Sequence, residues 1–150
     1  NIPLAAIYRP LNNFFLNPFM EYLRKKYICK KQIRKGINGV RESIECIKKG
    51  QSIALMIDQR VSEGIKVDFF GKPALTTSLP AQLAIKFNLP IVPVFIERDT
   101  NYNYKIKFFD PIKNSNLENK EEITKKLNQV LESMILKNPN EWIWTHNRWK

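Results

Sequence analysis

A carboxylate, an amide and a guanidinium stand side by side at Asp58, Gln59 and Arg60, directly after the apolar run 52–57. An arginine at such a place can bind a phosphate through two parallel hydrogen bonds. Asp58 could orient that arginine or accept a hydrogen bond from a substrate hydroxyl. The alternative is a polar turn that closes a strand. Loops beyond strand ends often carry binding sites, which keeps both interpretations open.

A second arginine, Arg9, follows another apolar segment, Ile2–Tyr8, and precedes Pro10. In open α/β sheets, ligands bind beyond the carboxyl ends of the strands. Because Arg9 and Asp58 both follow predicted strands, we expect them to belong to one site.

Two bulky aromatic side chains and a flexible residue occur together at Phe69, Phe70 and Gly71. They are candidates for an apolar wall that holds an acyl chain. Packing in the protein core is the commoner use of phenylalanine.

The sole histidine, His146, lies among three tryptophans near the end of the sequence. It could act as a general base, belong to an interfacial element, or be a structural histidine. The structural interpretation is favoured because no carboxylate lies nearby in the sequence. Motifs for a P-loop, a zinc site or a Gly-x-Ser-x-Gly elbow are absent from the sequence, and no metal site is expected.

The formal net charge is +11, and the segment 21–50 carries ten basic residues against three acidic ones. Such a segment attracts polyanions, namely nucleic acid, anionic lipid or a phosphorylated substrate, although a solvated basic face is the simpler interpretation. The two cysteines fit neither a disulfide framework nor a metal motif. Cys46 is predicted to be a small core residue.

Predicted strands and helices alternate along the sequence, and this alternation indicates an α/β fold. These elements must position the side chains named above. Strands are expected at 2–8, 52–57, 67–70, 91–96 and 102–108, with 52–57 in the centre of the sheet and buried on both faces. Helices are expected at 11–27, with a break near Asn17-Pro18, and at 38–49, 77–87 and 117–136.

Five segments in order resemble the lauroyl and myristoyl acyltransferases of late lipid A biosynthesis, within the wider glycerolipid acyltransferase group. They are Tyr8-Arg9-Pro10, Gly50 before Asp58-Gln59, 69–73 with Thr76-Thr77, 90–94 and 142–150. The resemblance implies that 1–150 is the C-terminal portion of a single acyltransferase domain. It implies a mixed central sheet flanked by helices, with the N-terminal part missing.

The group's motif of a histidine and, five residues later, an acidic residue does not occur in this sequence. The resemblance implies that this motif lies upstream of Asn1, together with a membrane anchor, so the chain alone is expected to be inactive. By the same resemblance Arg9 contacts a phosphorylated acceptor, and Asp58, Gln59 and Arg60 belong to the acceptor site. Pro93 has a backbone role near that site. His146 and Arg148 are further candidates.

The implied reaction transfers an acyl chain from acyl carrier protein to a hydroxyl of a lipid A precursor, without a cofactor. The implied location is the cytoplasmic face of the inner membrane, peripheral or anchored, and an anionic membrane surface is a further partner. The alternative is a non-enzymatic basic α/β module that binds nucleic acid or anionic lipid. Nucleic acid is disfavoured because most aromatic residues fall in apolar strands or helix stripes.

Overall fold

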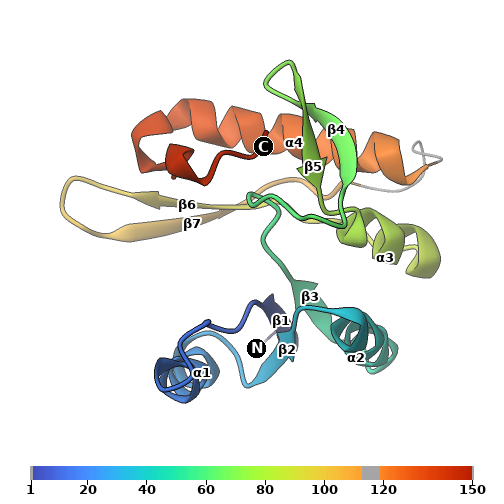
Figure 1. Ribbon diagram of the computed structural model, residues 1–150, viewed down its shortest axis with the longest axis vertical. Coiled ribbons are helices and arrows are strands. Elements are labelled where there is room, and N and C mark those ends of the chain that lie inside the picture. The colour runs from blue at the N-terminus through green and yellow to red at the C-terminus, as the bar shows by residue number, and fades with distance from the viewer. Residues whose placement is uncertain (1, 113–118, 150) are drawn as a thin grey trace. The chain divides into compact units, whose positions relative to one another are not determined.

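The computed structural model describes residues 2–112 and 119–149, which form two compact units, Asn1–Met56 and Ile57–Lys150 (Figure 1). Each unit is described by itself. The first contains β1 (Leu4–Tyr8), α1 (Leu16–Tyr27), β2 (Lys31–Arg34), α2 (Ile37–Lys48) and β3 (Ser52–Ala54). The second contains β4 (Ile65–Phe69), β5 (Lys72–Thr76), α3 (Leu79–Phe87), β6 (Val94–Arg98), β7 (Tyr104–Phe108), α4 (Lys120–Lys137) and the short 3-10 helices η2 (Pro139–Glu141) and η3 (Trp144–His146).

The first unit is built on a parallel sheet with the strand order β2-β1-β3. Its core joins Ala5 and Ile33 on the strands to Cys46 on α2, so the predicted burial of Cys46 is confirmed. The strand predicted at 52–57 is shorter than expected and lies at the sheet edge. β1 takes the central position because β2, which the hydrophobic pattern did not reveal, pairs with its other side.

The helix α1 begins at Leu16, five residues later than predicted. The Asn13 side chain accepts hydrogen bonds from the backbone N–H groups of Phe15 and Leu16 at 3.0 and 3.1 Å. These bonds fix the start of the helix. Asn17-Pro18 therefore lies in the first helical turn, where proline is tolerated, and the predicted break there is wrong.

In the second unit, β4 and β5 form an antiparallel hairpin, and α4 packs along β4 (Figure 1). Phe70 and Gly71 make the two-residue turn, with φ angles of 52° and 72°. A two-residue turn with two positive φ angles has a backbone twist that matches the twist of the flanking strands, which favours a tight hairpin. The amphipathic helix prediction is confirmed in α4, whose Ile123, Leu127 and Ile135 are buried. Leu117, where that helix was expected to begin, lies outside the described residues.

The strands β6 and β7 pair only with each other, as an antiparallel ribbon. The prediction of a buried strand at 91–96 is wrong. The strand covers Val94–Arg98, and its residues alternate between exposed and half-buried positions. Pro90 and Pro93 carry no backbone donor, and Ile91 makes only an isolated bridge to Ile112. β7 is exposed along its whole length, although the sequence predicted a half-exposed strand.

These elements confirm the α/β class. The described strands form three small sheets, one parallel and two antiparallel, and not the single mixed sheet that was expected. No described helix is both long enough and apolar enough to cross a bilayer. That 1–150 is one part of a larger acyltransferase domain stays a prediction.

Candidate functional site

A cavity of about 820 Å³ opens in the first unit beside the ends of β1 and β2 and the start of α2. It is lined by Tyr8, Glu21, Lys25, Lys31, Gln32, Arg34, Lys35, Gly36, Ile37, Asn38, Gly39 and Glu42. Four of these side chains are basic and two are acidic. The cavity therefore carries a positive excess and suits an anionic ligand.

The chain passes from β2 to α2 beside this cavity and places backbone N–H groups there. β2 ends at Arg34, Gly36 turns the chain with φ of 135°, and α2 begins at Ile37. No side chain caps the start of α2 by a hydrogen bond. The first N–H groups of a helix lack partners within the helix, and the helix dipole makes this end positive, so it favours anions.

Gly39 lets α2 approach β2 closely. A Cβ atom at this position would clash with the carbonyl oxygen of Arg34. The absence of a side chain at Gly39 thus sets the distance between the helix start and the strand end that border the cavity.

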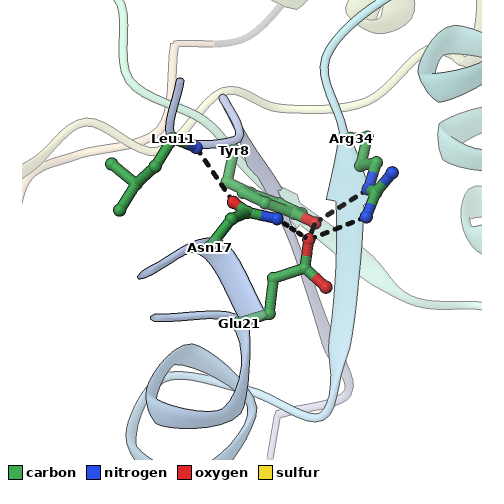
Figure 2. A network of polar contacts seen from close by, with 5 residues as sticks. All are labelled: Tyr8, Leu11, Asn17, Glu21 and Arg34. Atoms are coloured by element: carbon green, nitrogen blue, oxygen red, sulfur yellow. Dashed lines mark hydrogen bonds and ion pairs between the residues drawn. The ribbon is translucent and has the colours of Figure 1, made fainter. Parts of the chain in front are cut away.

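A network of polar contacts holds Arg34 in place (Figure 2). The Tyr8 hydroxyl donates to Glu21 Oε1 at 2.7 Å, and Arg34 Nη2 donates to the same oxygen at 2.9 Å. Arg34 Nε donates to the Tyr8 hydroxyl oxygen at 3.2 Å, and Asn17 donates to Glu21 at 2.9 Å. The Arg34 side chain remains 66% exposed, so most of it is accessible to a ligand.

The network also fixes the charges. The hydrogen bond from Tyr8, followed by those from Asn17 and Arg34, lowers the pKa of Glu21 to about 2. The hydrogen bonds with Tyr8 and Glu21 raise the pKa of Arg34. Tyr8 and Glu21 therefore present a permanently charged guanidinium in a fixed orientation, which is what recognition of a phosphate requires.

In the second unit, the Arg148 side chain is the largest that is fully buried, with 1% exposed. Its guanidinium lies 4.1 Å from the centroid of the Phe69 ring, and Nη2 donates to Thr76 Oγ1 at 2.8 Å. Nε and Nη1 of Arg148, and Oδ1 of Asp58, are buried without a hydrogen-bond partner among the described residues. Burial lowers the pKa of Arg148, and the charges of Asp58 and Glu132 partly offset this effect.

This buried cluster ties the end of the chain to the β4–β5 hairpin. Trp149 Nε1 donates to the Phe69 carbonyl oxygen at 3.0 Å, and the Trp149 ring stacks on Phe69 at 5.5 Å between centroids. Glu132 of α4 accepts a hydrogen bond from the Phe70 N–H at 2.7 Å. Phe69 is completely buried, so its contacts are those of a core residue.

The structure brings several of the predicted site residues together. Asp58 and Arg148 interact electrostatically, and the backbone N–H of Arg60 donates to His146 Nε2 at 3.1 Å. The hydrogen-bonded position of His146 agrees with the structural interpretation. Phe70 is half-buried beside Phe69, and Gly71 is exposed in the hairpin turn.

Three predicted site residues make none of these contacts. The side chain of Gln59 is exposed, and Pro93 is half-buried, with its carbonyl oxygen accepting from the Phe109 N–H at 3.0 Å. Arg9 is exposed and belongs to the first unit, whereas Asp58 belongs to the second. The shared site of Arg9 and Asp58 stays a prediction.

The sequence reasoning missed Arg34 as a site residue. The available signal was Gln32-Ile33-Arg34-Lys35-Gly36 directly before the predicted helix, because a strand, a glycine and a helix in succession create an anion site. The strand was overlooked because it is short and only Ile33 in it is apolar.

The two units are of the α/β class, and the first carries a basic cavity at the end of its parallel strands, a place where ligands often bind in α/β proteins. The family model of bacterial lipid A biosynthesis acyltransferases matches residues 2–150. The chain therefore belongs to this acyltransferase family, as the sequence predicted. Among curated proteins, none matches the sequence.

Proposed function

We propose that this chain takes part in the transfer of a fatty acyl group from acyl carrier protein to a hydroxyl of a phosphorylated lipid A precursor. In this reaction the carbon–sulfur bond of the thioester breaks and a carbon–oxygen ester bond forms. The hydroxyl proton passes to a base, and the thiol of acyl carrier protein is released. Membership of the acyltransferase family supports the reaction class.

The observation that carries the acceptor assignment is the basic cavity around Arg34. A lipid A precursor presents a phosphate and a sugar, and the cavity offers a fixed guanidinium, flexible lysines and the positive end of α2. Lys31 and Arg34 are ion-paired with Glu42 and Glu21 at 3.1 and 2.9 Å, so Lys25 and Lys35 supply the positive excess, and Arg34 supplies the oriented guanidinium. Phosphate binding would place the acceptor beside the ends of β1 and β2, with the reacting hydroxyl on one of its acyl chains.

His146 is a poor candidate for the base. Its Nε2 atom accepts the hydrogen bond from Arg60, and no carboxylate contacts the ring among the described residues. A histidine that acts as a general base is typically oriented by a carboxylate that accepts a hydrogen bond from its other ring nitrogen.

The acyl donor is proposed to dock on the same unit. Acyl carrier protein is acidic, and the segment 21–50 concentrates basic residues. Electrostatic complementarity of this kind raises the association rate and makes it sensitive to salt. The proposed location is the cytoplasmic face of the inner membrane.

Isothermal titration of the chain with the phosphorylated lipid A precursor tests the acceptor assignment. Binding is expected, and Arg34→Gln together with Lys35→Gln should weaken it at least tenfold, on the order of 1.5–3 kcal/mol for charge-assisted hydrogen bonds. The dephosphorylated precursor serves as the ligand control, and Lys137→Gln, on α4 of the other unit, serves as the charge control. Equal binding of both precursors contradicts the assignment, and tighter binding of single-stranded RNA favours the nucleic-acid alternative.

A further inference from the structure

The helix α1 turns its polar side toward the first unit and its aromatic side away from it. Asn17 and Glu21 point toward Tyr8 and Arg34 (Figure 2). Phe15 and Phe19, by contrast, are 87% and 58% exposed. This orientation is the reverse of a helix that packs on a core through its apolar stripe.

Four exposed aromatic residues form what we term the aromatic stripe: Phe14, Phe15, Phe19 and Tyr22. The spacing of four and then three residues from Phe15 to Tyr22 puts these side chains on one helical face. Phe14 extends the stripe, since its ring meets that of Phe15 edge to face at 6.0 Å. A contiguous exposed apolar patch of this kind marks an interaction surface.

Cationic side chains continue the aromatic stripe at the end of the helix. Lys26 Nζ lies 5.8 Å from the Tyr22 ring centroid and 5.1 Å from that of Tyr27. Lys25 and Lys30 are also exposed there. Aromatic side chains beside exposed lysines fit a surface that is apolar inside and negatively charged outside, which describes an anionic lipid bilayer.

We infer that α1 is a membrane-docking helix, which lies in the plane of an anionic bilayer with the aromatic stripe inserted among the acyl chains. Twelve residues are too few to span the hydrocarbon layer, but they suffice for a helix at the interface. Lys26 and Lys30, which do not line the acceptor cavity, contact the lipid phosphates. The inference does not depend on the acceptor cavity, because the aromatic side chains of the stripe do not line it.

Co-sedimentation of the chain with vesicles tests this surface. We expect binding to vesicles that contain phosphatidylglycerol and weaker binding to pure phosphatidylcholine vesicles. The double variant Phe15→Ser, Phe19→Ser should lose at least tenfold in partitioning, because it removes two large apolar side chains that would be buried in the bilayer. The matched control is Leu136→Ser, Ile143→Ser, which removes two exposed apolar side chains from the other unit and should bind as the parent chain does.

Unchanged vesicle binding by the Phe15→Ser, Phe19→Ser variant would overturn the inference, as would failure of the parent chain to bind any vesicle. Sedimentation velocity without lipid tests a second copy as the occupant: a dimer that this variant converts to a monomer would also overturn it. Titration of the same variant with the phosphorylated precursor separates the two proposals. The variant should retain precursor binding, since the cavity around Arg34 is intact.

Discussion

At the scale of single residues, Glu21 shows how the first unit holds its charges. Its pKa lies at about 2 chiefly because the Tyr8 hydroxyl donates to its carboxylate. A carboxyl whose pKa is lower in the folded than in the unfolded protein stabilises the fold at pH values above its pKa in the unfolded protein. That stabilisation is lost as the pH falls from about 4.5 to about 2.

The first prediction follows from this contact. Tyr8→Phe should raise the pKa of Glu21 toward 4.5, because the largest contribution to its depression is removed. An NMR titration of the Glu21 carboxyl carbon measures the midpoint directly. The control is Tyr22→Phe, which removes an exposed hydroxyl from α1, the helix that carries Glu21. It should leave the titration midpoint of Glu21 at about 2. An unshifted midpoint in Tyr8→Phe contradicts the network in Figure 2.

In the second unit, the charged residue to test is Arg148, whose side chain is buried. Arg148→Ala should lower the free energy of unfolding by about 3 kcal/mol, because it removes a positive charge that acts on the buried Oδ1 atom of Asp58 and leaves a cavity on Phe69. Urea unfolding followed by tryptophan fluorescence measures the loss, since all three tryptophans lie in this unit. Adding Asp58→Asn should restore part of the stability. Arg60→Ala, at an exposed position, should change it by less than about 0.5 kcal/mol.

At the scale of elements, the contact of α2 with β2 shapes the cavity. Gly39→Ala should destabilise the first unit and weaken binding of the phosphorylated precursor, because the new methyl group meets the Arg34 carbonyl and must push the helix away. Amide hydrogen exchange of β2 and precursor titration measure the two effects. Glu45→Ala, at an exposed position of the same helix that does not line the cavity, is the matched control. Normal stability and binding in Gly39→Ala would contradict the close approach.

The elements also show how far the sequence could predict this structure. Periodicity located α2 and α4 to within a residue or a few, because their apolar stripes face a core. It failed for β2, where only Ile33 is buried, and for β6, because the apolar run at 91–96 contains Pro93 and β6 pairs with one strand only. The motif order identified the family. The pairing of Tyr8 with Glu21 and Arg34 depends on strand register, which local pattern does not specify.

At the scale of the whole molecule, the sequence lacks the motif of a histidine followed five residues later by an acidic residue. The chain alone should not transfer acyl groups, because no carboxylate among the described residues contacts its only histidine, and the Nε2 atom of that histidine accepts a hydrogen bond from the Arg60 backbone. A radiolabelled transfer assay with acyl carrier protein thioester and the lipid A precursor tests this. The informative variant is His146→Ala. If the parent chain transfers acyl groups and this variant does not, His146 is the base and the prediction is wrong.

The central claim is that the cavity around Arg34 receives the phosphate of the acceptor. Backbone amide chemical shifts, recorded while the phosphorylated lipid A precursor is added to the 150-residue chain, test it most directly. The account predicts the largest shifts at Gly36 to Gly39, where α2 begins, and none of comparable size with the dephosphorylated precursor. Shifts centred on Asp58 and Arg148, with residues 36–39 unchanged, would contradict it.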